Sequence, residues 1–289
     1  MSRNRLEMWT PFFEDTLVSA DLLWWMNSAT LTWVPLVAVL TLFLGALAIY
    51  AVKTAVTGLQ TTERGRKAGG SAVLGAFFVE YGLWLFRPAV RVLVRIGAHP
   101  DHLSWTSWWL HVVAALALSQ GGFGLAGWTL LFGAICDSLD GSVARARGLS
   151  SDAGEVLDAV IDRWAEMVVF FGYAWYYRAM PVGFVLALGA CAGAIMVSYT
   201  RAKGEILQVD AGMGLMQRHE RATWLIVATI FSTVIERWWP STAPGTPPHH
   251  WLVLAALAAI AVFANATAMV RTRYIRAELR ARSIAKPTS

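Results

Sequence analysis

Charged residues and cysteines are scarce in this sequence, and their scarcity excludes several classes of protein. Of its 289 residues, 15% are charged and 56% are hydrophobic, and the mean hydropathy is +0.50. This composition is typical of a polytopic membrane protein and not of a soluble domain. The two cysteines, Cys136 and Cys191, fall in apolar segments without a CxxC partner, so we expect them to be small core residues.

Three other signals are also missing. No signal peptide is expected, because the first long apolar run begins only near residue 30. The six histidines form no metal-binding pattern. His111 stands alone in an apolar segment, where we expect a hydrogen-bonded core residue, and His249 and His250 fall in a distant loop. The net charge of +5 does not indicate nucleic-acid binding, because the basic residues flank apolar segments.

Apolar segments long enough to span a bilayer follow one another along the chain. Residues 1–29 mix charged and aromatic side chains and are expected to form a surface or interfacial helix. A first span is predicted at 31–52, and a polar linker follows around 61–70. The break at 99–104 would cap the next helix through Asp101 or Ser104. Six further spans are predicted at about 104–120, 123–145, 153–176, 181–203, 218–238 and 251–272.

Residues 75–97 have a different pattern. Arg87, Arg91 and Arg95 recur every four residues, and Glu80 falls on the same helical face. The opposite face is apolar and comprises Phe78, Leu85, Val92 and Ile96. The pattern predicts an amphipathic helix that lies in the membrane interface instead of crossing the membrane.

The basic residues orient the predicted spans. Twenty of the 24 lysines and arginines fall in segments that this topology places on one side: 53–95, 145–163, 201–221 and 271–286. The positive-inside rule assigns that side to the cytoplasm, which is the inner face of the inner membrane if the source is a bacterium. Arg3, Arg5, Arg178 and Arg237 remain for the other side. An aromatic belt is expected there, formed by Trp24, Trp25, Trp33, Trp175, Tyr176, Tyr177, Trp238, Trp239 and Trp251.

Four carboxylates interrupt two of the predicted spans. Asp137 and Asp140 are three residues apart and Asp158 and Asp162 are four apart, so each pair shares one helix face. A helical hairpin that turns near Ser150 would bring Asp140 level with Asp158, and Asp137 level with Asp162. An ionised Asp inside a bilayer costs at least about 2.5–3.5 kcal/mol, so such residues are functional by default. Four converging carboxylates require cations, and their hard oxygens suit two Mg²⁺ or Mn²⁺ ions.

These acids are part of a longer motif, D-x2-D-G-x2-A-R-x8-G-x3-D-x3-D. Its fixed positions are filled by Asp137, Asp140, Gly141, Ala144, Arg145, Gly154, Asp158 and Asp162. The motif resembles the signature of the CDP-alcohol phosphotransferase family of membrane enzymes, and the resemblance covers roughly residues 75–275. It implies an all-α polytopic fold with a six-helix transmembrane core that follows an interfacial helix. We therefore expect residues 1–72 to form an extension with one extra transmembrane helix, and residues 73–289 to form the family-like domain.

The resemblance also implies a reaction. A phosphatidyl group would move from CDP-diacylglycerol to the hydroxyl of a polar alcohol, with release of CMP, in phospholipid biosynthesis. Asp137, Asp140 and Asp158 would chiefly bind metal, and Asp162, also a metal ligand, would deprotonate the alcohol. Gly141, Ala144 and Gly154 would leave room for the cytidine nucleotide. Arg145 would pair with a phosphate or a carboxylate, or else reach the interface as a snorkelling side chain. Members of the family are commonly homodimers, so a homodimer is expected.

A second stretch concerns the acceptor. Ser198 to Ala202 reads Ser-Tyr-Thr-Arg-Ala and resembles a segment of inositol-type members, including phosphatidylinositol phosphate synthases, although Gly204 interrupts the usual continuation. Arg201 and Arg218 could bind a phosphate on the acceptor, which points to inositol phosphate. The alternative is that they are ordinary positive-inside flanking charges.

Two other functions fit an acidic membrane site. An intramembrane Mg²⁺-dependent prenyltransferase also uses Asp-rich helices, but its two motifs normally lie far apart in sequence, whereas Asp137 and Asp162 are 25 residues apart. A cation transporter could use the acids as an ion pathway. The transporter hypothesis leaves Gly141, Ala144 and Arg145 unexplained at their fixed offsets.

Overall fold

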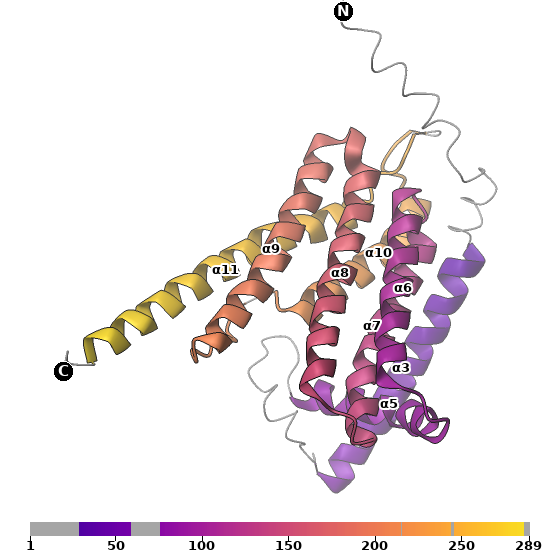
Figure 1. Ribbon diagram of the computed structural model, residues 1–289. Helices are drawn as coiled ribbons and strands as arrows, with labels where there is room; N and C mark the ends of the chain where they lie inside the picture. Colours follow the sequence, from indigo (N-terminus) through magenta and orange to yellow (C-terminus); the bar gives the residue numbers. More distant parts are fainter. Residues whose placement is uncertain (1–28, 59–75, 215, 244–245, 286–289) are drawn as a thin grey trace, which may run out of the picture.

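The computed structural model describes residues 29–58, 76–214, 216–243 and 246–285, and every regular element within them is helical (Figure 1). The all-α prediction is therefore confirmed for this part of the chain. The helices are α3 (Ala29–Thr57), α5 (Ala76–Arg95), α6 (Pro100–Ser119), α7 (Phe123–Ala146), α8 (Asp152–Tyr176), the 3₁₀ turn η1 (Tyr177–Ala179), α9 (Pro181–Ile206), α10 (Arg218–Trp238) and α11 (Trp251–Ala285). The predictions for residues 1–28 and for the linker at 61–70 lie outside the described residues.

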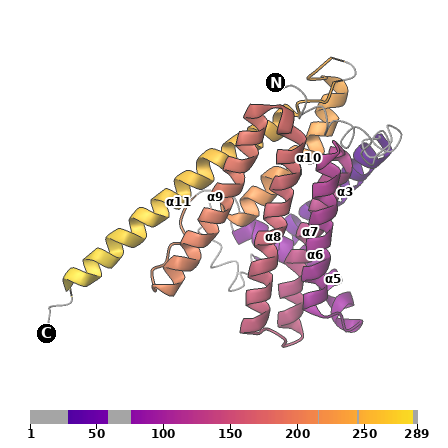
Figure 2. The ribbon, with the colours of Figure 1, turned by 45° about the horizontal axis from the view of Figure 1, so that its top comes forward.

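Helices α6, α7 and α8 are roughly aligned, whereas α11 runs obliquely to them and α5 crosses the end at which α6 begins (Figures 1 and 2). Helix α6 packs along both α7 and α8, while α7 and α8 have few direct contacts with each other. Helices α9 and α11 pair along much of their length, and α10 contacts both α7 and α11. Helix α3 lies on the outside, against α7, α10 and α5.

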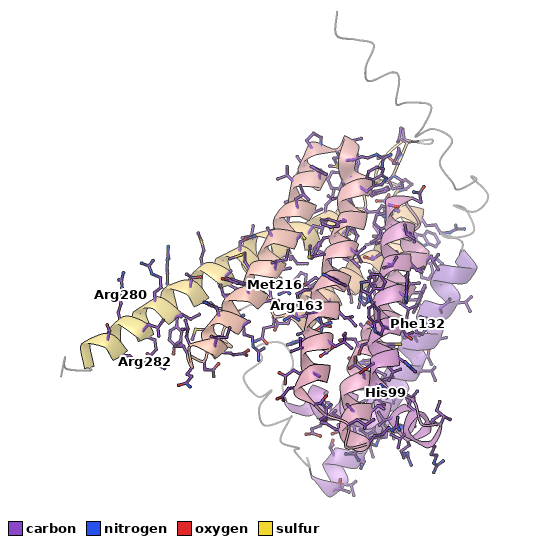
Figure 3. The ribbon with its side chains drawn as sticks, in the orientation of Figure 1. His99, Phe132, Arg163, Met216, Arg280 and Arg282 are labelled. Atoms are coloured by element: carbon purple, nitrogen blue, oxygen red, sulfur yellow. The ribbon has the colours of Figure 1, made fainter. Side chains whose placement is uncertain are left out.

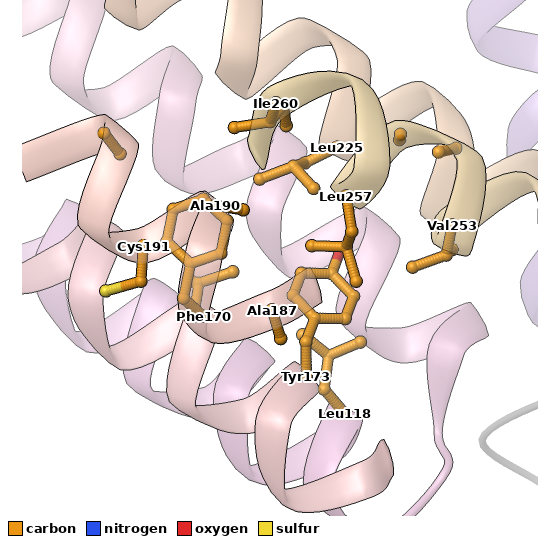
Figure 4. Packing of buried hydrophobic residues seen from close by; sticks show 14 of the residues in the cluster. Leu118, Phe170, Tyr173, Ala187, Ala190, Cys191, Leu225, Val253, Leu257 and Ile260 are labelled. Carbon is orange, nitrogen blue, oxygen red and sulfur yellow. The ribbon is translucent and has the colours of Figure 1, made fainter. Parts of the chain in front are cut away.

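One apolar core fills the bundle between α6, α7, α8, α9, α10 and α11 (Figure 4). Small residues let its helices approach closely, as is usual where lipid surrounds the bundle. A Cβ atom at Gly172 of α8 would lie 2.7 Å from the carbonyl oxygen of Ala115 in α6. A Cβ atom at Gly193 of α9 would lie 2.6 Å from Nδ2 of Asn265 in α11. Cys191 lies in this core, as expected of a small apolar side chain.

In the part of the chain that the structure describes, three helices are long and apolar enough to cross a membrane: Trp33–Thr57, Pro181–Ile206 and Trp251–Ser283. Large apolar side chains cover the outside of the bundle, including Leu42 of α3 at 73% exposure and Phe171 of α8 at 52%. An exposed apolar surface of this kind is stable in lipid and not in water. The chain is an integral membrane protein.

The predicted spans coincide with helices, but three helices continue past their predicted ends, and the first of these, α3, ends at Thr57 instead of about 52. Helices α9 and α11 end at Ile206 and Ala285 instead of about 203 and 272. Their last turns are polar and carry ion pairs one turn apart, between Arg201 and Glu205 and between Arg282 and Glu278. Such pairs stabilise an exposed helix without adding hydrophobicity, so a search for apolar runs ends too early.

Helix α5 differs from its predicted pattern at one residue. Arg87, Arg91 and Arg95 are exposed, but Glu80 is buried, at 3% exposure, and does not share their exposed face. The first half of α5 packs against α3, where the Tyr81 hydroxyl donates a 2.7 Å hydrogen bond to the Phe43 carbonyl. This packing covers a face that helical periodicity alone assigns to solvent. The side chain of Phe78 lies outside the described residues.

Two further predictions are corrected. The cap of α6 is His99, whose Nδ1 accepts a weak 3.4 Å hydrogen bond from the Asp101 N–H, and neither Asp101 nor Ser104 is the cap. Tyr177 is buried and donates to the His249 carbonyl at 2.9 Å, so it does not belong to an exposed aromatic belt. The belt residues that are exposed are Trp175, Trp238, Trp239 and Trp251. Trp24 and Trp25 lie outside the described residues.

Candidate active site

Three of the four predicted carboxylates meet between α7 and α8. One carboxylate oxygen from each of Asp137, Asp158 and Asp162 lies within 4.8 Å of the other two. Asp137 comes from α7, and the other two lie one turn apart on α8. The Asp162 side chain is 6% exposed and that of Asp137 is 20% exposed, so the group reaches from the bundle interior toward its surface.

Asp140 lies beside this group and has its own partners. Its Oδ2 accepts a 2.6 Å hydrogen bond from the Ser104 hydroxyl of α6, and its Oδ1 accepts from the Gly141 N–H at 2.5 Å. Asp140 is therefore not one of the three residues whose carboxylate oxygens converge; it is held instead by α6 through Ser104.

A guanidinium group completes the acidic cluster. Arg218, the first residue of α10, donates from Nη2 to Asp137 Oδ1 at 2.9 Å and forms an ion pair with Asp162 Oδ1. Arg163 Nη1 lies 3.2 Å from the other oxygen, Asp162 Oδ2. Arg218 was predicted to bind an acceptor phosphate, and its contact with the carboxylates was missed, because 81 residues separate it from Asp137 and no local pattern links the two.

A second ion pair, in which the arginine is fully buried, lies one helical turn from the first. Arg221 is 0% exposed and binds Glu166 with two hydrogen bonds, Nε to Oε1 at 2.8 Å and Nη2 to Oε2 at 3.0 Å. Its Nη1 donates to the Met216 carbonyl at 2.6 Å. Glu166 is one turn beyond Asp162, and Arg221 is one turn beyond Arg218, so this pair sets the register of α10 against α8. Sequence analysis overlooked Glu166, although an acid within an apolar run is itself a signal.

The other predicted site residues lie toward the turn between α7 and α8. A Cβ atom at Gly141 would be 3.2 Å from Arg145 Nη1, and Arg145 Nη2 approaches the Ser142 hydroxyl at 3.4 Å. Ala144 is half-buried on the same helix. Gly154 donates from its N–H to Ser151, the cap of α8, at 3.2 Å.

Arg201 differs from these residues. It is exposed at the end of α9, where its Nε donates to Glu205 at 2.9 Å, and among the described residues no hydrogen bond or ion pair joins it to Asp137, Asp158 or Asp162.

A cavity of about 50 Å³ continues from the carboxylates into the bundle. Its lining is polar near Asp162, Glu166 and Arg218, and apolar at Leu130 and Val169. It also contains His111, whose Nδ1 lies 2.7 Å from the Ser107 carbonyl, as expected of a hydrogen-bonded core residue. The volume suits a few water molecules and not a nucleotide.

The donor atoms fit a hard divalent cation. Carboxylate oxygens are the ligands that Mg²⁺ and Mn²⁺ prefer, and three of them converge here. Asp162 Oδ1 is buried and receives no well-formed hydrogen bond from the described residues, although the Arg218 guanidinium lies against it. A buried carboxylate oxygen without a hydrogen bond is costly unless a cation compensates it.

Fold and site together define the class of protein: a polytopic membrane enzyme whose helices hold acidic and basic side chains around one point. The family model for CDP-alcohol phosphatidyltransferases matches residues 97–270, and the chain belongs to this family. The resemblance inferred from the Asp-rich motif is thereby confirmed. Family membership favours this enzymatic activity over the prenyltransferase and transporter alternatives.

The similar proteins include a phosphatidylinositol phosphate synthase and an archaetidylinositol phosphate synthase. A phosphatidylinositol phosphate synthase of Mycobacteroides abscessus is 34% identical over 192 residues, which cover 64% of this chain and 83% of the relative. An archaetidylinositol phosphate synthase of Methanothermobacter thermautotrophicus is 27% identical over 177 residues, which cover 60% of this chain and 86% of the relative.

The chain is also similar in fold to solved structures of a phosphatidylinositol phosphate synthase. The crystal structure of Mycobacterium tuberculosis phosphatidylinositol phosphate synthase with CDP-DAG bound has a TM-score of 0.56 at 25% identity and covers 65% of this chain and 92% of that one. A second structure of that enzyme, in complex with manganese and citrate, has a TM-score of 0.56 and covers 87% of its own chain.

Proposed function

We propose that this enzyme transfers the phosphatidyl group of CDP-diacylglycerol to a hydroxyl of inositol phosphate and releases CMP. The observation that carries the proposal is the convergence of Asp137, Asp158 and Asp162 with Arg218 at one point between α7, α8 and α10. The similarity to phosphatidylinositol and archaetidylinositol phosphate synthases supports the choice of acceptor.

Asp137, Asp140, Asp158 and Asp162 are the proposed ligands of two divalent ions, Mg²⁺ or Mn²⁺. The manganese complex of the Mycobacterium tuberculosis enzyme supports this assignment. When bound, the ions would neutralise the diphosphate of the donor and stabilise the attacking and leaving oxygens. Ser104 holds Asp140 by a 2.6 Å hydrogen bond and so fixes the orientation of this carboxylate.

Asp162 is the proposed base. Its carboxylate accepts the proton of the acceptor hydroxyl while the alcohol oxygen forms a bond to the phosphorus of the phosphatidyl group. The bond between that phosphorus and the oxygen of CMP breaks, and CMP leaves with the electron pair. Arg163 on Oδ2 and Arg218 on Oδ1 fix the orientation of the Asp162 side chain, and the carboxylate can act as the base when one of these oxygens is free to accept the proton.

The remaining site residues divide between the two substrates. Gly141, Ala144 and Gly154 lie near the turn of α7 and α8 and leave space for the cytidine nucleotide, with Arg145 beside them for a phosphate. Arg201 and Arg218 are the proposed ligands of the acceptor phosphate. Arg201 is exposed and paired only with Glu205 among the described residues, so its guanidinium can exchange that partner for a phosphate.

The membrane arrangement is part of the proposal. Helices α6 to α11 would form the six-helix transmembrane core, α5 would lie in the interface, and α3 would be an extra transmembrane helix in an extension that ends near residue 72. The basic helix ends and the turn of α7 and α8 lie at one end of the bundle (Figure 1), which by the positive-inside rule faces the cytoplasm. A homodimer is proposed from the family resemblance.

The test is a product analysis. Purified protein in nanodiscs is incubated with CDP-diacylglycerol, Mg²⁺ and one of four acceptors: inositol phosphate, inositol, glycerol phosphate or serine. CMP release and a lipid of the mass of phosphatidylinositol phosphate are expected with inositol phosphate alone. CMP release with a different acceptor would overturn the choice of acceptor, and no CMP release with any acceptor would overturn the reaction.

A further inference from the structure

The guanidinium of Arg218 occupies the carboxylate oxygens that the metal site requires. Its Nη2 binds Asp137 Oδ1 at 2.9 Å and also pairs with Asp162 Oδ1. Asp137 and Asp162 are two of the three residues whose oxygens lie within 4.8 Å of one another. A divalent cation bound by the same oxygens would lie next to a positive guanidinium, and like charges at such a distance repel strongly in a partly buried site.

We propose that Arg218 and the divalent cation compete for Asp137 and Asp162, and that Arg218, once released, binds the phosphate of the acceptor. The inference rests on the proposed function, because it takes a phosphorylated alcohol as the second substrate. It follows that the two ligands are coupled through Arg218. Binding of the cation releases Arg218 to bind the phosphorylated acceptor, and binding of that acceptor to Arg218 frees the carboxylates for the cation.

The surroundings of Arg218 allow its side chain to move while its backbone stays in place. Its side chain is 37% exposed, whereas that of Arg221, one turn further on, is 0% exposed. Arg221 is held by Glu166 and by the Met216 carbonyl, so the first turn of α10 is anchored independently of the acidic cluster. An arginine on an anchored turn can exchange a carboxylate for a phosphate, since its planar guanidinium binds either group with two hydrogen bonds.

Arg163 does not replace Arg218 in this exchange. It follows Asp162 directly on α8 and contacts the other oxygen, Oδ2, at 3.2 Å. Figure 3 shows Arg163 on the middle helices of the bundle, far from Arg280 and Arg282 at the end of α11. Arg218 alone among the described arginines joins two of the three clustered carboxylates.

The experiment measures Mn²⁺ binding by isothermal titration calorimetry with the full chain in nanodiscs. Four proteins are compared: the wild type, Arg218→Gln, Arg218→Lys and Arg282→Gln. The last is a matched control, because it removes one positive charge from an exposed pair with Glu278 at the end of α11. Each protein is titrated alone, with inositol phosphate, and with unphosphorylated inositol.

Arg218→Gln is expected to bind Mn²⁺ about 5–50-fold more tightly than the wild type, which is the usual range for coupling between two sites. Arg218→Lys should have an intermediate affinity for Mn²⁺, and the affinity of Arg282→Gln should equal that of the wild type. Inositol phosphate, but not inositol, should tighten Mn²⁺ binding to the wild type by about fivefold or more and have no such effect on Arg218→Gln. Equal or weaker Mn²⁺ binding by Arg218→Gln relative to Arg282→Gln would overturn the competition.

If Arg218→Gln does not fold, the Mn²⁺ titrations of the wild type with and without inositol phosphate still test the inference. No effect of inositol phosphate on Mn²⁺ binding to the wild type overturns the coupling. CMP release from CDP-diacylglycerol, measured on the same samples, separates the two proposals. Coupling without CMP release would overturn the proposed reaction and leave the inference standing, whereas CMP release without coupling would overturn the inference alone.

Discussion

The hydroxyl of Ser104 donates a 2.6 Å hydrogen bond to the carboxylate of Asp140, and both residues are buried. The two lie on different helices, α6 and α7, and are 36 residues apart in sequence. Short hydrogen bonds to a charged acceptor are among the stronger ones in proteins. This bond therefore joins the start of α6, which follows α5, to the acidic motif.

Ser104→Ala is expected to reduce the rate of CMP release about tenfold. The hydrogen bond that orients Asp140 contributes roughly 1–2 kcal/mol, and its loss should raise the activation free energy by a similar amount. Ser104→Thr should retain most of the rate, since it keeps the hydroxyl. Ser107→Ala is the control: Ser107 is also buried on α6 but donates to the Gly133 carbonyl and not to a carboxylate. A normal rate for Ser104→Ala would show that Asp140 needs no support from α6.

Glu166→Gln is expected to lower the free energy of unfolding by about 3–5 kcal/mol, because it leaves the buried guanidinium of Arg221 without its counter-charge. Thermal unfolding in nanodiscs measures the effect. Glu205→Gln is the comparison, since it breaks an exposed ion pair with Arg201 that is worth about 0–1 kcal/mol. Similar losses for the two variants would contradict the structural role of the Glu166–Arg221 pair.

The sequence was sufficient to locate the helices and the acidic motif. Predicted spans at 123–145 and 153–176 correspond to α7 (Phe123–Ala146) and α8 (Asp152–Tyr176), because apolar length and turn residues mark both ends. The helical period likewise places Asp158 and Asp162 on one face. Both inferences depend on residues that are close together in the chain.

Contacts between helices that are far apart in the sequence could not be predicted from local sequence patterns. The position of Asp140 depends on how α6 packs along α7 and α8, which neither local period nor rise per residue determines. Arg218 reaches Asp137 across 81 residues. Glu80 illustrates the same limit on α5, because its burial depends on how α5 packs against other helices, which helical periodicity does not determine.

Asp162→Asn is expected to lower the rate of CMP release by about 10²–10⁴-fold, which is the usual contribution of a positioned general base. The amide keeps the size of the side chain and leaves Arg163 and Arg218 in place, but it cannot accept the proton. Glu278→Gln, which removes a remote exposed carboxylate paired with Arg282, should leave the rate unchanged. Near-normal CMP release by Asp162→Asn, with an intact protein, would assign the base to another residue.

The same substitution at two glycines should have opposite effects on stability. At Gly172 an added Cβ would lie 2.7 Å from the Ala115 carbonyl oxygen, so Gly172→Ala must push α8 away from α6 and should cost about 1–3 kcal/mol. At Gly82 in α5 nothing lies within 4 Å of the added atom, so Gly82→Ala should stabilise the helix by about 0.4–1 kcal/mol. Thermal unfolding of both variants in the same nanodiscs measures the difference. A tolerated Gly172→Ala would mean that α6 and α8 are packed more loosely than their backbone separation indicates, and the placement of Ser104 and Asp162 by those two helices would lose its basis.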